Sequence, residues 1–198
     1  MFNKSVSILA TAILLGCVAQ ANAALVVDTG TPSGTGFALA VDGNDWLAAQ
    51  VHFSATSQIT AIQAYLDGGN VGDSFTVSLY DNVGSLPGTV LNSAVASFAS
   101  TGWNGASSLN WSVTSGDYWV AFEVQGSDTL SFGTAPVGAP QPVTRTAFNA
   151  GSGYQVTSQP LSFGVRVDAV SAVPVPAAAW LLGSGLLGFM GVARRSKA

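Results

Sequence analysis

The middle of the chain alternates apolar and polar residues with a period of two, and this pattern constrains the fold more than any other feature. In Ser74–Tyr80, the apolar residues Phe75, Val77 and Leu79 share one face. The same alternation recurs strongly in Leu47–Phe53, Tyr118–Val124 and Leu161–Asp168, and weakly around Val26, Ala38, Ile62, Val95, Val113 and Leu130. Half-buried β-strands have this period, so the sequence predicts an all-β domain.

Turn-forming residues separate these segments. Gly adopts backbone conformations that other residues avoid, and Asn and Asp bond their own backbone. The turn clusters are Asp42-Gly43-Asn44, Asp67-Gly68-Gly69-Asn70, Asp81-Asn82, Pro87-Gly88, Ser115-Gly116 and Gly151-Ser152-Gly153, and the Pro- and Gly-containing stretch Ala135–Gly153 predicts a long loop. Many short strands with one apolar face indicate two sheets on one core, so we expect residues 24–172 to form an antiparallel β-sandwich that is jelly-roll-like.

The N-terminal segment has the order of residues found in a secretory signal peptide. Lys4 precedes an apolar run over Val6–Ala19, and the small residues Ala21-Asn22-Ala23 follow it. We therefore expect residues 1–23 to be a signal helix that signal peptidase removes by cleavage between Ala23 and Ala24.

A second signal overlaps the first. Leu14-Leu15-Gly16-Cys17 resembles the lipobox of bacterial lipoproteins, in which the cysteine is acylated and becomes the mature N-terminus. Cys17 is the only cysteine of the chain. Cleavage at Ala23 therefore leaves a mature protein without disulfides or a reactive thiol, whereas lipoprotein processing keeps Cys17 as an anchor.

The C-terminal segment, residues 173–198, combines an extended stretch, an apolar run and a basic end. Val173-Pro174-Val175-Pro176 favours an extended chain. No charge occurs from Ala177 to Ala193, and a helix of that length reaches about 25 Å at about 1.5 Å per residue, close to the thickness of a bilayer core. We expect a transmembrane helix with a cytoplasmic membrane stop at Arg194, Arg195 and Lys197.

These residues, VPVPAAAWLLGSGLLGFMGVARRSKA, resemble the PEP-CTERM sorting tail of bacterial exported proteins. The resemblance implies that an exosortase-type membrane protease cuts near the proline motif and releases the protein to the cell surface or extracellular matrix. It also implies an association with exopolysaccharide and biofilm. Val175 departs from the family pattern, which has Glu between the prolines.

The middle of the chain is similar to exported modules called choice-of-anchor domains. Three stretches carry the similarity: Val77–Asn82, Leu86–Thr89 and Ser115–Val120. The resemblance implies a β-sandwich on the cell surface and names no ligand.

Charge excludes nucleic acid as a partner of the exported region. All ten acidic residues lie between residues 24 and 172, together with only two of the six Lys and Arg residues, Arg145 and Arg166. The formal charge of this region is therefore −8, whereas phosphate binding needs a basic footprint.

The reactive side chains of the same region argue against an enzyme, so we expect no catalytic residue and no resident cofactor. His52 alternates with Gln50 on the polar face of a strand, which predicts an exposed histidine, and no serine lies in a G-x-S-x-G motif. Glu123 is the only Glu and has no identifiable carboxylate partner for glycoside hydrolysis. A hydrolase that uses Glu123 or His52 is the enzymatic alternative.

Two binding hypotheses remain open. Asp42, Asn44 and Asp45 crowd one turn, and Asp67, Asn70 and Asp73 another, and such oxygen ligands suit Ca²⁺, although Asp and Asn also favour turns by themselves. Trp103, which follows a Gly in an expected loop, and Trp119, which opposes the Tyr118 face, are the candidate exposed aromatics for glycan contact. The sequence thus predicts a non-enzymatic exported surface or matrix protein, held in the membrane as a precursor, or a carbohydrate-binding module for exopolysaccharide.

Overall fold

The predicted alternation produces antiparallel strands throughout the part of the chain that can be described. The structure is a computed structural model that describes residues 24–34, 38–158 and 161–171. These ranges contain twelve β-strands and no helix, and every strand pair is antiparallel, which confirms the all-β antiparallel prediction. The expected signal helix and transmembrane helix lie outside these ranges. Inside them, no helix has the length and apolar character needed to cross a bilayer.

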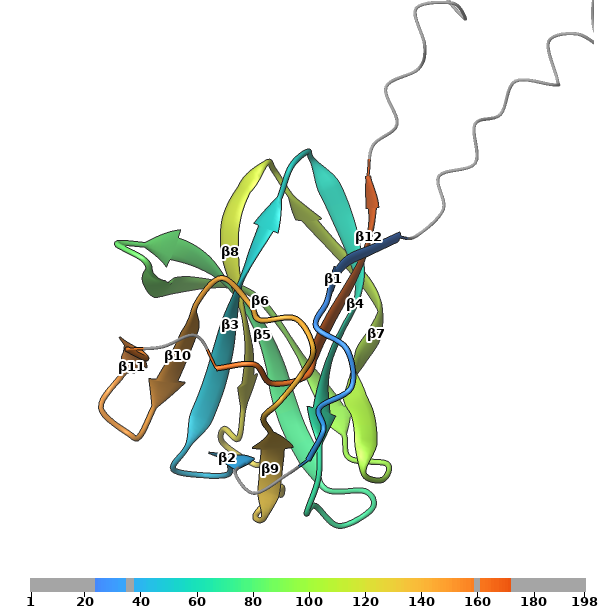
Figure 1. Ribbon diagram of the computed structural model, residues 1–198, viewed down its shortest axis with the longest axis vertical. Helices are drawn as coiled ribbons and strands as arrows, with labels where there is room; N and C mark the ends of the chain where they lie inside the picture. The colour runs from blue at the N-terminus through green and yellow to red at the C-terminus, as the bar shows by residue number, and fades with distance from the viewer. Residues whose placement is uncertain (1–23, 35–37, 159–160, 172–198) are drawn as a thin grey trace, which may run out of the picture. The chain divides into compact units, whose positions relative to one another are not determined.

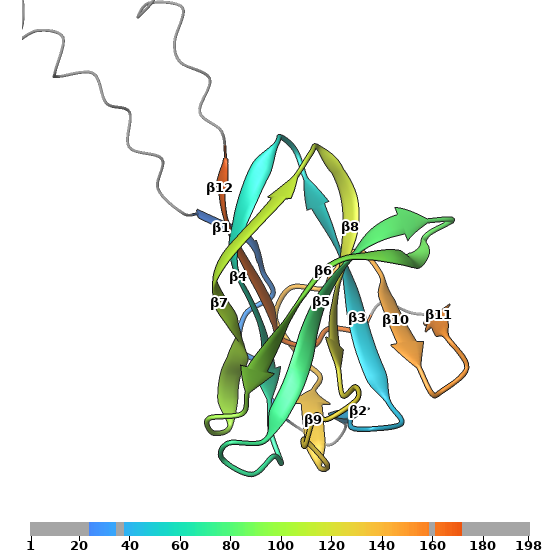
Figure 2. The ribbon, with the colours of Figure 1, turned by 180° about the vertical axis from the view of Figure 1, so that it is seen from behind.

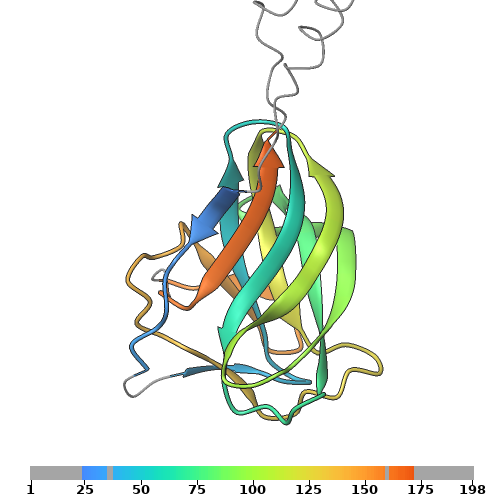
Figure 3. The same ribbon diagram turned by 90° about the vertical axis from the view of Figure 1, so that its right-hand side faces the viewer.

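The smaller main sheet has four strands, in the order β1-β12-β4-β7 (Figure 3). Its strands are β1 (Ala24–Asp28), β12 (Val165–Ser171), β4 (Ser57–Leu66) and β7 (Gly102–Val113). Ala24 lies opposite Ala169, so the beginning of β1 and the end of β12 are side by side. Both ends of the described domain therefore lie at one end of this sheet, as Figure 1 shows.

The larger sheet has six strands, in the order β11-β10-β3-β8-β5-β6 (Figures 1 and 2). Its strands are β11 (Tyr154–Val156), β10 (Thr146–Asn149), β3 (Trp46–Phe53), β8 (Gly116–Glu123), β5 (Ser74–Val83) and β6 (Leu86–Ser97). A further pair, β2 (Ala38–Val41) and β9 (Gly133–Pro136), forms a small sheet at the end of the domain away from β1 and the end of β12.

The core lies between the two main sheets. The inward residues of β4, Ile59 and Ile62, pack in one apolar cluster with the inward residues Val51, Val77 and Val120 of the larger sheet. All of them are at most 1% exposed. Alternate residues of these strands point to the outer faces instead, and those faces carry the side chains that bear on function.

Three local predictions differ from the structure. Leu130 is buried in the connection between β8 and β9 and belongs to no strand. The expected long loop, Ala135–Gly153, contains the end of β9 and all of β10, whose short length hides its alternation. Pro87-Gly88 lies within β6 and not in the turn, because the chain reverses at Gly84-Ser85, where both residues adopt positive φ.

Candidate functional site

The outer face of the four-stranded sheet gathers an aromatic pair and charged side chains near the end of β4 and the start of β12. Trp103 on β7 lies opposite Tyr65 on β4. Arg166 on β12 lies opposite Gln63 on β4 on one side and Asp28 on β1 on the other. These five residues define the Trp103 face. They point outward because their neighbours on β4, among them the fully buried residues at positions 62 and 64, face the core.

The guanidinium group of Arg166 is fixed in place from two directions. Its central carbon lies 3.9 Å from the centre of the Trp103 ring, and its Nε donates a hydrogen bond of 3.1 Å to Asp28 Oδ1. The Trp103 ring in turn meets the Tyr65 ring edge to face, with 5.7 Å between the ring centres. Within the described residues, no Nη group of Arg166 has a hydrogen-bond partner. The face therefore holds free hydrogen-bond donors beside an aromatic ring.

Asp28 remains a carboxylate in this arrangement. Partial burial raises its pKa, but the hydrogen bond from the Gly30 backbone N–H and the charge and hydrogen bond of Arg166 outweigh burial and bring the pKa below its usual value. The Asp28 and Arg166 side chains are each 31% exposed, so both partners of the pair reach solvent.

This set of groups is chemically suited to hydroxyl-rich ligands. The Arg166 fork donates hydrogen bonds, and Asp28 and Gln63 accept them, while the guanidinium already covers one face of the Trp103 ring. Gly105 lies opposite Gln63 beside Trp103 and adds no side chain to the face. A Cβ at Gly105 would overlap the β4 backbone at Ile62, so strand packing alone requires glycine here.

The two predicted glycan contacts have different outcomes. Trp103 is half-buried, and it lies in a strand and not in the expected loop. The expected exposure of Trp119 is wrong, because this side chain is fully buried. Its indole N–H donates a hydrogen bond of 2.9 Å to Asn82 Oδ1. Alanines at 48 and 147 on the neighbouring strands β3 and β10 and at 121 on β8 itself leave space for the indole, and Tyr154 of β11 packs against this cluster.

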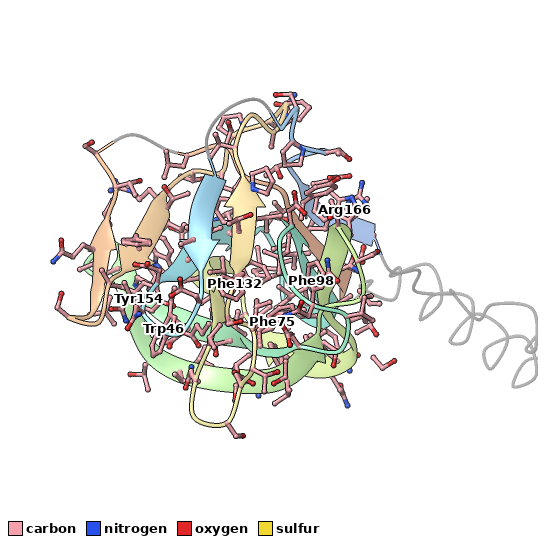
Figure 4. The ribbon with its side chains drawn as sticks, turned by 90° about the horizontal axis from the view of Figure 1, so that it is seen from below. Trp46, Phe75, Phe98, Phe132, Tyr154 and Arg166 are labelled. Carbon is pink, nitrogen blue, oxygen red and sulfur yellow. The ribbon has the colours of Figure 1, made fainter. Side chains whose placement is uncertain are left out.

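A buried carboxylate cluster occupies the outer face of the six-stranded sheet. Glu123 on β8 is fully buried. Its Oε1 accepts hydrogen bonds from the hydroxyls of Tyr80 (2.7 Å) and Tyr154 (2.6 Å), and its Oε2 accepts from Ser78 Oγ (2.6 Å) and Gln125 Nε2. We call these five residues the Glu123 cluster. It links β8, β5 and β11, and Figure 4 shows Tyr154 on the side of the domain opposite Arg166.

The hydrogen bonds of this cluster take the place of a cationic partner. Burial, together with the hydrogen bonds and negative charge of Glu123, raises the pKa values of Tyr80 and Tyr154 above the usual tyrosine value, so both phenols stay protonated and donate. All four donors converge on one carboxylate, which keeps its two oxygens satisfied without contact with solvent. Sequence reasoning missed this cluster, although Ser78 and Tyr80 share the polar face of one strand.

His52 is exposed, as predicted. Its Nδ1 lies 2.7 Å from Asp117 Oδ1, directly across the β3–β8 ladder, and the two side chains are 62% and 49% exposed. Among the described residues His52 bonds with Asp117 alone, so no hydroxyl or thiol is poised beside it. A nucleophile activated by this histidine is therefore not assembled in the described part of the chain.

One aspartate in each candidate calcium turn bonds its own loop, whereas Asp67 also accepts a hydrogen bond from Thr101 Oγ1, outside its turn. Asp42 Oδ1 accepts hydrogen bonds from the backbone N–H groups of Asn44 (2.8 Å) and Asp45 (3.1 Å). Asp73 Oδ2 accepts from the backbone and side-chain N–H groups of Asn70 (3.0 and 3.2 Å). Over the residues described, no group of three or more His, Cys, Asp or Glu side chains is placed to hold a metal ion. Calcium binding stays a prediction.

Comparison with known proteins assigns no family: no family model and no curated protein matches the chain. The predicted sorting residues, Val173–Pro176 with Arg194, Arg195 and Lys197, and Ala23 of the predicted cleavage site lie outside the described residues. Function must therefore be inferred from side chains and their geometry.

Proposed function

We propose that this chain is a non-enzymatic exported protein that acts at the cell surface or in the extracellular matrix. Two sequence features support export and retention: the signal-like residues 1–23 and the apolar, basic-ended tail of residues 173–198. Signal peptidase and an exosortase-type membrane protease are the processing partners in this proposal. The adjacent ends of β1 and β12 agree with it, because both terminal segments then leave the domain at the same end.

We further propose that the domain is a jelly roll. A jelly roll has eight strands in two Greek keys. The first strand pairs antiparallel with the last, the second with the next to last, and so on to the two middle strands. The pairs β1–β12, β3–β8, β4–β7 and β5–β6 follow this scheme, with the first strand against the last and the innermost pair forming a hairpin. The remaining strands, β2, β9, β10 and β11, are then additions to the eight-strand scheme.

The absence of catalysis is supported by how the two candidate catalytic residues are used. Glu123 has no exposed surface, and four hydrogen bonds already engage its carboxylate. A general acid or nucleophile must reach its substrate, which Glu123 does not do in this arrangement. His52 bonds an exposed aspartate and has no nucleophile beside it among the described residues.

As a second proposal, the exported domain binds exopolysaccharide through the Trp103 face. The observation that carries this proposal is the Arg166 guanidinium, held between Trp103 and Asp28 with its Nη donors free within the described residues. The formal charge of −8 on residues 24–172 repels polyanions, so we infer that the preferred glycan is neutral.

Intact-mass analysis of the exported product tests the first proposal. We expect a chain that begins at Ala24 and ends near Pro176. A lipid-modified N-terminus at Cys17 would replace the signal-peptide hypothesis by the lipoprotein one. A cytosolic location of residues 24–172, mapped with protease in intact and permeabilised cells, would refute export.

Glycan binding is tested by pull-down of the full chain with insoluble neutral glucans, with polygalacturonate as the anionic comparison. Trp103→Ala is expected to weaken binding at least about tenfold, since a buried aromatic side chain contributes on the order of 1.5–3 kcal/mol. Arg166→Lys keeps the charge but loses the planar fork and is expected to weaken binding as well. Phe132→Ala is the matched control, because Phe132 is 72% exposed and lies off this face. Equal binding by the Trp103 and Phe132 variants would remove the Trp103 face from the proposal.

A further inference from the structure

The two main sheets of the described domain have four border strands, and three of them offer a poor edge for pairing. β11 has three residues and β1 has five. β7 has twelve, but its pairing with β4 is irregular between Ile59 and Ala61, where Ser108 adopts a φ of 56°. Such a bulge interrupts the row of backbone groups that a new strand would need.

The fourth border strand, β6, is different. It has twelve residues, and within the described chain it is hydrogen-bonded with β5 alone (Figure 2). β7 and β11 also come close to β6, but neither forms a ladder with it. One side of the β6 backbone is therefore left without strand partners, and such an edge is a template for another strand.

Exposed apolar side chains gather on this strand and its hairpin partner. Val95 is 70% exposed, Val90 46%, Leu91 44%, and Val83 at the end of β5 58%. These are four of the eight large apolar side chains that are exposed in the described residues. Proteins usually protect an edge strand with charges, yet Leu86–Ser97 contains no charged residue.

The available stretch is the half of β6 away from the hairpin turn. Near the turn, Pro87 cannot donate a backbone hydrogen bond, and the register with β5 shifts on both sides of Tyr80. From Ser74 opposite Ser97 to Leu79 opposite Asn92, the register is regular. Asn92–Ser97 therefore presents an edge of regular register with Val95 exposed beside it.

We propose that Asn92–Ser97 pairs antiparallel with the same segment of a second copy of this chain, so that two six-stranded sheets join across a twofold axis. Such an axis brings identical patches together and makes β6 antiparallel to itself, which is the arrangement that an antiparallel ladder requires.

The distribution of charge favours β6 as the surface on which a second copy docks. Two domains of formal charge −8 repel each other wherever their acidic surfaces approach. At β6 they meet along a strand without charges. Three carboxylates beside this hairpin are engaged in hydrogen bonds: Asp81 accepts from the Thr89 backbone N–H, Asp128 accepts from Thr76 Oγ1 (2.7 Å), and Asp73, next to Ser74, accepts from the Asn70 backbone N–H (3.0 Å).

The test measures the mass of the purified full chain by sedimentation over a range of concentrations, in one detergent throughout. The wild-type chain is expected to shift from monomer to dimer as its concentration rises. Val95→Lys places two ammonium groups near the axis and is expected to raise the dissociation constant at least about tenfold. Val71→Lys is the matched control, because Val71 is a still more exposed valine, at 81%, in the turn between β4 and β5.

Cross-linking gives an independent readout that does not depend on a destabilising lysine. In a Cys17→Ser background, Val95→Cys is expected to form a disulfide-linked dimer on mild oxidation, and Val71→Cys is expected to form much less. A wild-type chain that stays monomeric, or a dimer that both lysine variants weaken equally, would overturn the proposal. Equal cross-linking of the two cysteine variants would overturn it too, because association would then occur through another part of the chain.

Discussion

The Glu123 cluster makes a quantitative prediction about the stability of the domain. Tyr154→Phe removes one hydroxyl donor from a fully buried carboxylate and changes nothing else in size or shape. Glu123 Oε1 then keeps only the hydrogen bond from Tyr80. Because a hydrogen bond to a charged group contributes about 1.5–3 kcal/mol, we expect the free energy of unfolding to fall by that amount. For a domain of this size, the loss corresponds to a melting temperature lower by about 3–12 °C.

The same substitution elsewhere supplies the control. Tyr118 also donates or accepts through its hydroxyl, 3.0 Å from Thr114 Oγ1, but this contact is exposed and involves no charge. Tyr118→Phe is therefore expected to change the free energy of unfolding by no more than about 0.5 kcal/mol. Urea unfolding of the full-length wild type and both variants at neutral pH gives the comparison. If the two variants lose the same stability, Glu123 does not depend on its phenol donors and our account of the buried carboxylate is wrong.

Further predictions concern pH and two strand positions. The folded state raises the pKa values of Tyr80 and Tyr154, so the domain binds their protons more tightly than the unfolded chain does. Their full contribution to the free energy of unfolding is therefore present below the unfolded pKa of 10.0 and is lost as the pH rises above it. Urea unfolding across alkaline pH should show a smaller loss for Tyr154→Phe. Asn104→Asp should lower the free energy of unfolding, measured by thermal unfolding, by about 3 kcal/mol or more. The buried Asn104 amide donates hydrogen bonds to the Ser100 and Gly102 carbonyls (2.9 and 2.8 Å), and a carboxylate would repel both of them. Asn104→Ser is the control and should lower the stability less. Gly105→Ala should destabilise the domain by about 1–3 kcal/mol in the same assay, since its Cβ would overlap the β4 backbone; an unchanged melting temperature would show that the strands can separate there.

The main strands were predictable because their alternation is long and uninterrupted. Ser74–Tyr80 and Leu47–Phe53 lie within β5 and β3, and their apolar residues face the core as the pattern requires. β10 and β11 were not predictable, because they have only four and three residues and follow a stretch rich in proline. β10 is placed by its pairing with β3, a long-range contact that no local pattern records, and β11 in turn pairs with β10.

Missing β11 also explains the error about Trp119 and why the Glu123 cluster was not predicted. Both side chains alternate correctly to the outer face of β8, where a sandwich of two sheets alone would leave them in water. Tyr154 on β11 packs on the Tyr80 ring, 5.7 Å between centres, and bonds Glu123, so this part of the outer face becomes a second interior. The sequence pattern identifies which side chains share a face, but it does not reveal that a later strand returns to cover that face.

The outer face of the four-stranded sheet has the same kind of pattern, but its charged side chains stay accessible, which supports the proposal that the Trp103 face is the binding face. Arg166 and Asp28 reach solvent there, whereas Glu123 does not. The position of the face is also favourable. Ser57 lies opposite Ser171, where the described chain ends, and Tyr65 is eight residues further along β4, about 26 Å away at about 3.3 Å per residue. If a tail beyond β12 holds the domain at a membrane, Trp103 and Arg166 lie at the far end of the sheet, where a polysaccharide outside the membrane can reach them.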